Sequence, residues 1–104
     1  MSDWMLKVGP KPGDGPPPEK LDEWHYRLDV RATDARGGTQ DVVVEAAGHP
    51  GYKSTATMVG EAALALADPD SGVPDGAGFL TPATSLGLAV IDRMAEAGVT
   101  FEIL

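Results

Sequence analysis

The chain has no cysteine among its 104 residues. Disulfides, thiolate nucleophiles and zinc or iron–sulfur sites with cysteine ligands are therefore excluded. Basic residues are also few: 8 Lys and Arg stand against 16 Asp and Glu, for a formal net charge of −8. Nucleic acids and anionic membranes bind basic surfaces, so we expect neither as a partner.

Long apolar runs are missing as well. No window approaches the roughly 20 apolar residues that cross a membrane, and the first residues have no apolar core of signal-peptide length. We therefore expect a cytoplasmic protein. The hydrophobic fraction of 42% is ordinary for a globular protein. A chain of this length predicts one domain with a small core.

The N-terminal part is rich in residues that interrupt regular structure. Residues 9–20 contain five prolines and three glycines, which excludes a helix or a central strand there. Residues 1–8 form a short apolar arm before this linker. We predict an arm and linker over residues 1–20 and a folded domain over residues 21–104.

Three segments alternate as half-buried strands do. The first covers residues 24–33, and Gly37 and Gly38 then favour a hairpin turn into a second strand over residues 39–47. A third strand is predicted at residues 99–104. The expected core-facing residues of the three strands are Trp24, Tyr26, Leu28, Val30, Ala32, Val42, Val44, Ala46, Val99, Phe101 and Ile103.

Two segments have helical periodicity. Residues 54–67 predict a helix with Ser54 as its N-cap. Its predicted buried stripe consists of Ala56, Val59, Ala63 and Leu66, and Met58, Ala62 and Leu64 widen this stripe. Residues 82–97 predict a second helix, with Thr81 as N-cap and Gly98 at its C-terminal end. The order strand, strand, helix, helix, strand predicts an α+β fold: a small antiparallel or mixed sheet with two helices on one face.

The stretch GHPGYKST, residues 48–55, lies between a strand and a helix as a nucleotide-binding P-loop does. The P-loop pattern requires glycine at two positions that hold Ala47 and Tyr52 here. We therefore interpret the stretch as a structural turn. The remaining alternative is a weak anion site formed by Lys53 and free amides at the helix start.

The same turn holds the candidate catalytic residues His49, Tyr52 and Lys53, which offer acid–base groups, with Asp41 or Glu45 to orient them. His25, the other histidine, is predicted to lie on the solvent side of its strand. No metal site is predicted. The acidic loop around Asp68, Asp70 and Asp75 has Phe79 where a calcium loop requires glutamate.

The order of several motifs resembles the C-terminal end of saccharopine dehydrogenase-like oxidoreductases, in the branch of trans-acting enoyl reductases. The resemblance covers nearly the whole chain, with His49 where the family usually has aspartate. It rests on KPGDGP (11–16), GHPGY (48–52), GEAAL (60–64), LTPA (80–83) and GVTFE (98–102).

The resemblance implies that this chain corresponds to part of the family's second domain. In the full-length enzymes that domain packs on a Rossmann domain and helps shape the substrate cleft. This chain carries no glycine fingerprint for NAD(P), so no cofactor is expected on it. Three hypotheses remain open. The chain is an accessory or oligomerisation module that pairs with itself or with a Rossmann-bearing subunit, or half of a split NAD(P)-dependent reductase. Alternatively, it is a small cofactor-free enzyme, an isomerase, cyclase or dehydratase that binds an acyl or polyketide-like small molecule.

Overall fold

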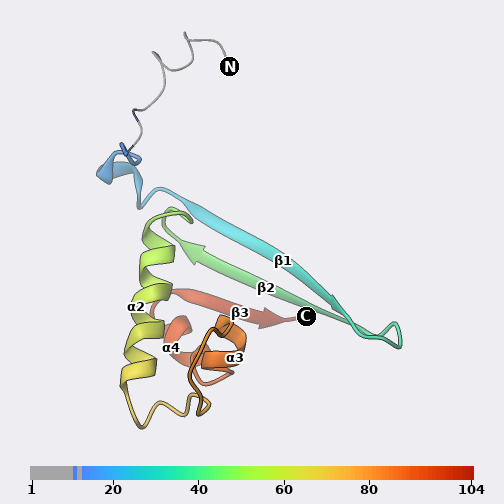
Figure 1. Cartoon of the computed structure of the whole chain (residues 1–104). Helices are drawn as coiled ribbons and strands as arrows, with labels where there is room; N and C mark the ends of the chain where they lie inside the picture. Colours follow the sequence, from blue (N-terminus) through green and yellow to red (C-terminus); the bar gives the residue numbers. More distant parts are fainter. Residues whose placement is uncertain (1–10, 12) are drawn as a thin grey trace.

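The computed structural model describes residue 11 and residues 13–104 (Figure 1). The predicted arm over residues 1–8 lies outside the described residues. The elements are η1 (Pro18–Lys20), β1 (His25–Thr33), β2 (Thr39–Ala47), α2 (Lys53–Ala67), α3 (Pro82–Leu86), α4 (Ile91–Glu96) and β3 (Val99–Ile103). The α+β class and the predicted order of strands and helices are confirmed. The exclusion of a helix from residues 9–20 was wrong at its end, where η1 is a short 3-10 helix that begins with proline, a residue that the first helical turn accepts.

The sheet is antiparallel throughout, with β2 between β1 and β3. β1 and β2 pair along their full length, from His25 opposite Ala47 to Thr33 opposite Thr39. β3 pairs only with Val42–Ala46 of β2. Because of this difference, the β1–β2 hairpin extends well beyond β3 and the helices (Figure 1).

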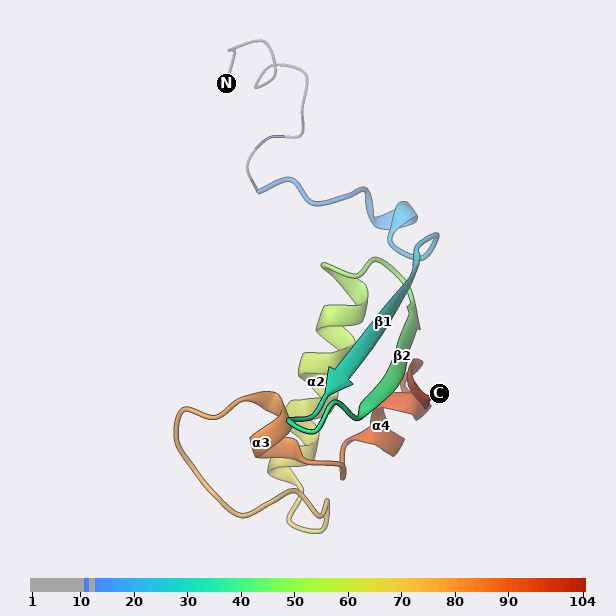
Figure 2. The ribbon, with the colours of Figure 1, turned by 90° about the vertical axis from the view of Figure 1, so that its right-hand side faces the viewer.

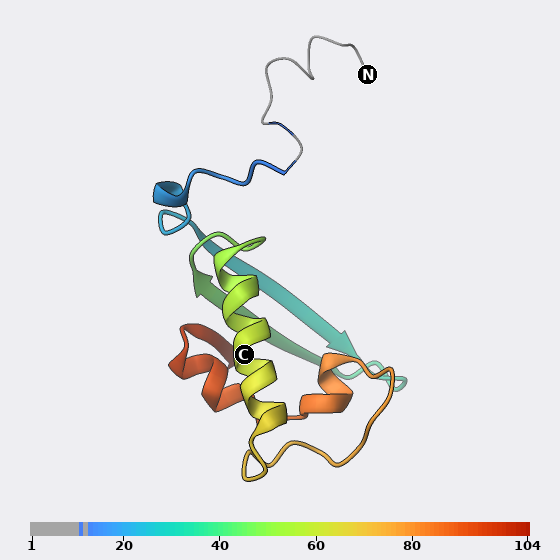
Figure 3. The same ribbon diagram turned by 60° about the vertical axis from the view of Figure 1, so that its left-hand side comes forward.

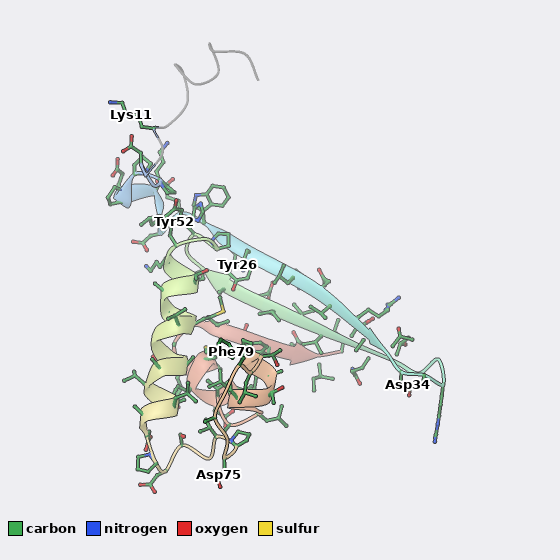
Figure 4. All side chains as sticks on the ribbon, viewed as in Figure 1. Lys11, Tyr26, Asp34, Tyr52, Asp75 and Phe79 are labelled. Carbon is green, nitrogen blue, oxygen red and sulfur yellow. The ribbon has the colours of Figure 1, made fainter. Side chains whose placement is uncertain are left out.

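The hairpin turn forms where the glycines predict it. Oδ1 of Asp34 accepts hydrogen bonds from the backbone N–H groups of Arg36 and Gly38, each at 2.8 Å. Gly37 has φ of 84°, which favours glycine. Figure 4 shows Asp34 at the tip of the hairpin, far from the helices.

The helices cover one face of the sheet at one end, as Figure 3 shows. The buried core at that end takes residues from both layers: Ala46, Ala65, Leu86, Val90, Met94 and Val99. Tyr26 and Val44 pack against it from the sheet. The core is small because the helices reach only this end of the strands.

The prediction of the buried stripe of α2 was correct for Met58 and Ala62, which pack half-buried against the core, and wrong for the remaining residues. The helix buries its small residues Ser54 and Ala65 against the sheet. The predicted residues Val59 and Leu66 are mostly exposed. Alanine, leucine and valine lie all round this helix, so no single apolar stripe specifies its orientation.

The predicted second helix is divided into α3 and α4. Thr81 caps α3 as expected, and its side chain accepts a hydrogen bond from the N–H of Thr84 at 3.3 Å. The helix ends at Gly87, whose φ of 58° and ψ of −148° are not helical. A short turn then leads into α4, and Gly98, with φ of 91°, ends the helical region as predicted.

The long segment of residues 68–81 links α2 to α3 without a helix or strand. Figure 2 shows it as a wide arc that leaves the body of the domain. Asp75 and Phe79 lie on this arc (Figure 4), and Phe79 is fully exposed. Leu80, at its end, returns to the helices and faces the groove described below.

Candidate functional site

The turn between β2 and α2 is fixed by backbone hydrogen bonds to the segment before β1. The N–H of His49 donates to the carbonyl of Leu21 at 2.8 Å, and the N–H of Gly48 donates to that of Trp24. The hydroxyl of Ser54, which is 2% exposed, donates to the carbonyls of Ala47 at 3.1 Å and Gly48 at 3.4 Å. The turn is therefore held from both sides.

Ser54 is not the N-cap that the sequence predicts. α2 begins one residue earlier, at Lys53, and Tyr52 occupies the cap position without a capping side-chain hydrogen bond. Ser54 instead lies inside the first turn and points its hydroxyl back at the end of β2. Its hydroxyl therefore links the first turn of α2 to the end of β2.

The imidazole of His49 lies between two aromatic rings. Its centroid is 4.8 Å from that of Trp24 and 5.1 Å from that of Tyr52, which meets it edge-on at 70°. Nδ1 of His49 accepts a hydrogen bond from the N–H of Gly51 at 3.1 Å. In the neutral ring this places the proton on Nε2, so the imidazole can donate to a ligand through that atom.

Lys53 is paired with the carboxylate of Asp22. The predicted alternatives, Asp41 and Glu45, are engaged elsewhere: Asp41 with Arg31 at 2.6 Å and Glu45 with Arg27 at 3.4 Å. The prediction that one of them orients the turn was therefore wrong. Asp22 was missed because no spacing in the sequence links it to Lys53, and only the fold brings the two together.

The turn thus assembles all three predicted catalytic residues, His49, Tyr52 and Lys53, at the N-terminal end of α2, where Figure 4 shows Tyr52. Tyr52 and Lys53 are exposed and His49 is half-buried. The groups can exchange protons with a ligand at the surface. None of the three lines the apolar groove described next, and their catalytic role stays a prediction.

A separate apolar groove of about 740 Å³ lies on the helix side of the domain. Met58, Val59, Ala62 and Leu66 of α2 form one wall. The rest of the lining comes from the end of the long loop, α3, the α3–α4 turn, α4 and β3: Leu80, Pro82, Ala83, Ser85, Leu86, Gly87, Leu88, Val90, Ile91, Met94 and Phe101. Sequence reasoning missed it because Val59 and Leu66 were expected in the core.

Among the described residues, none that lines the groove is charged. Its one polar side chain, Ser85, donates to the carbonyls of Thr81 at 3.1 Å and Pro82 at 3.4 Å within its own helix. Nearby charges are paired outside it: Arg93 of α4 contacts Glu61 at 3.3 Å and Asp68 at 3.5 Å. The groove therefore offers apolar contact and little hydrogen bonding.

A second group of charged side chains lies on the sheet face away from the helices: Arg27, Asp29, Arg31, Asp41, Glu45 and Glu102. The guanidinium of Arg31 hydrogen-bonds Asp41 and lowers the pKa of that carboxyl below its usual value. Val43 is 2% exposed on the same face, between Asp29 and Glu102 in the strand register. His25 is exposed beside Glu45, as predicted, with 4.0 Å between Nε2 and Oε1.

The topology does not suit a dinucleotide. In the described residues all strands pair antiparallel, so the parallel strand–helix–strand unit that carries the dinucleotide fingerprint is not formed there. Over the same residues, no group of three His, Asp or Glu side chains is placed to hold a metal ion. None of the described helices is long and apolar enough to cross a membrane.

The chain is similar to bacterial reductases over most of its length. A Mycobacterium tuberculosis protein, provisionally named a trans-acting enoyl reductase, is 36% identical over 98 residues, which are 94% of this chain and 23% of that protein. The trans-acting enoyl reductase of Mycobacterium ulcerans is 36% identical over 95 residues, 91% of this chain and 22% of its own length. That of Mycobacterium bovis strain BCG is 34% identical over 93 residues, with 89% and 22% covered.

The chain therefore spans about a quarter of the length of the curated relatives it matches. No protein-family profile matches it. No solved structure matches it either.

Proposed function

We propose that this chain is a cleft and assembly domain of an oxidoreductase similar to the trans-acting enoyl reductases, and that it works packed against the part of such an enzyme that binds NAD(P). The observation that carries the proposal is the match of nearly the whole chain to one quarter of those reductases. The antiparallel sheet supports it, because a dinucleotide site then belongs to another part of the enzyme.

The uncovered part of the sheet supports an assembly role. Beyond the reach of the helices, the helix-side face carries Leu28, Val30 and Ile103, which are 49–73% exposed. Val30 and Ile103 are both opposite Val42 in the register, so they form a continuous apolar row across the three strands. We call Leu28, Val30 and Ile103 the bare sheet surface. Contiguous apolar surface of this kind marks a site of contact with another protein surface.

The strand edges also favour packing against a further body. β1 pairs with β2 on one side only, and so does β3, so each leaves an unpaired edge within the described residues. Such edges accept another strand or need cover. The remaining three quarters of a reductase would supply both the cover and the cofactor site.

Reconstitution tests this function. The segment matching this chain is removed from the M. tuberculosis relative, and this chain is added to the remainder. We expect NADPH-dependent reduction of an enoyl thioester to be restored. Leu28→Asp combined with Val30→Asp should prevent restoration, and the matched pair Arg27→Asp with Arg31→Asp on the opposite sheet face should not. No restoration with a well-folded remainder would contradict the proposal.

A second candidate is the small cofactor-free enzyme, and the cluster of His49, Tyr52 and Lys53 at one turn is the observation that favours it. The chain would then catalyse proton transfer on an acyl substrate without a partner. His49→Ala, Tyr52→Phe and Lys53→Ala test this candidate one by one. Unchanged activity of the isolated chain in all three variants would eliminate it.

A further inference from the structure

We infer that the apolar groove between α2, α3, α4 and β3 binds the aliphatic part of an acyl substrate. Its volume of about 740 Å³ lies within the range of small-molecule pockets, roughly 300–1,000 Å³. The inference rests on the proposed function for one point, that the ligand is an acyl group. The relatives are named enoyl reductases, and an enoyl group is an unsaturated acyl group.

The lining determines the chemistry of the ligand. Every side chain in the groove except Ser85 is apolar, and the Ser85 hydroxyl is already bonded within α3. An extended peptide placed there would leave its backbone N–H and C=O groups without partners, which is unfavourable. A hydrocarbon chain loses no hydrogen bonds on entry, so it fits this surface better than an extended peptide.

The shape favours a small occupant over a second copy of the chain. The groove is concave, with the α2 residues Val59 and Leu66 on one side, Leu80 and Leu88 on the other, and Met94 and Phe101 also in its lining. Val59, Leu66 and Leu88 are each more than half exposed. Much of their apolar surface is therefore left uncovered by the described residues, and an alkyl chain in the groove would cover it.

The groove is distinct from the turn at His49. None of His49, Tyr52 and Lys53 lines it. The groove would therefore hold the tail of the substrate, and the polar end would project toward groups outside the groove. Binding energy from the tail would position the reacting double bond in the assembled enzyme.

Two leucines of α2 allow a matched test. Leu64 and Leu66 are 56% and 57% exposed, and only Leu66 lines the groove. The isolated chain is titrated calorimetrically with butanoyl, octanoyl and dodecanoyl thioesters of N-acetylcysteamine. We expect Kd to fall about tenfold from butanoyl to octanoyl, since each further methylene that leaves water strengthens binding and an open groove buries only part of each.

Leu66→Asp should weaken octanoyl binding at least tenfold, and Leu64→Asp should leave it within about twofold. Three results overturn the inference: no binding, a Kd independent of chain length, or equal losses in the two variants. A dimer by light scattering that excludes the thioesters would also overturn it and give the groove to a second copy. The titration needs no reductase partner, so its failure is distinguishable from failed reconstitution.

Discussion

Leu64 and Leu66 lie two residues apart on α2 and are equally exposed, yet only Leu66 faces the apolar groove. A third side of the helix, which carries Ser54 and Ala65, is buried against the sheet. One face of α2 therefore packs against the sheet, and Leu66 lies on a neighbouring apolar face that lines the groove. Because Leu66 is mostly exposed, it can be changed with little effect on the core.

The first prediction concerns this separation. Leu66→Asp should change the free energy of unfolding by no more than about 0.5 kcal/mol, because the side chain is mostly exposed. It should also reduce the fluorescence of a bound apolar dye such as anilinonaphthalene sulfonate, since it places a charge in the groove. Leu64→Asp should match it in urea unfolding but leave dye binding unchanged. A large loss of stability in Leu66→Asp alone would assign Leu66 to the core.

The second prediction concerns the junction of β2 and α2. Ser54→Ala should lower the free energy of unfolding by about 1 kcal/mol, because it removes a buried hydroxyl that bonds two carbonyls at the end of β2. Ser85→Ala is the control, since that hydroxyl bonds only within its own helix. Urea denaturation of both variants should show a clear loss for Ser54 and little change for Ser85. Equal effects would mean that Ser54 does not fix the junction.

The third prediction uses two glycines with opposite expectations. Gly87→Ala should destabilise by about 1–3 kcal/mol, because its backbone conformation is one that only glycine adopts without strain. A Cβ there would also lie 3.2 Å from Cγ of Pro74. Gly60→Ala should stabilise by about 0.5–1 kcal/mol, since Gly60 is inside α2 and a Cβ there meets no atom within 4 Å. Thermal unfolding should show a lower Tm for Gly87→Ala and a higher Tm for Gly60→Ala than for the parent chain.

The fourth prediction concerns acid stability. The Arg31 hydrogen bond lowers the folded-state pKa of Asp41 below its usual 3.8. The pair therefore stabilises the fold above about pH 4, and this contribution is lost as the pH falls through the lowered pKa. Asp41→Asn should be less stable than the parent at pH 7 and equal to it near pH 2. The effect is small because the pair is solvent-screened.

The strands were predictable because alternation fixes which residues share a face of the sheet. Burial does not follow the alternation everywhere. The prediction of a core position was wrong for four large side chains that are 49–73% exposed: Trp24, Leu28, Val30 and Ile103. The last three are exposed because the helices cover only one end of the sheet, and Trp24 lies just before β1. Val43 was predicted on the solvent side and is buried there, between Asp29 and Glu102 in the register. The cap at Thr81 and the end at Gly98 were predictable because both depend on local chemistry.

The burial of α2 and the break at Gly87 were not predictable in the same way. Both depend on packing between segments far apart in the sequence: the sheet beneath α2, and Pro74 against Gly87. The same distinction between local sequence and tertiary packing applies to the candidate site. The turn at His49 is local and could be found, while its partner Asp22 and the groove are products of the tertiary fold.

The most direct test of the assembly role is the molar mass of the native particle, by light scattering on the chain mixed with the remainder of the M. tuberculosis relative. The account predicts a complex with one copy of each component, which Leu28→Asp with Val30→Asp dissociates. Two separate species at micromolar concentrations, each with the mass it has alone, would contradict the claim that this domain works packed against the rest of a reductase.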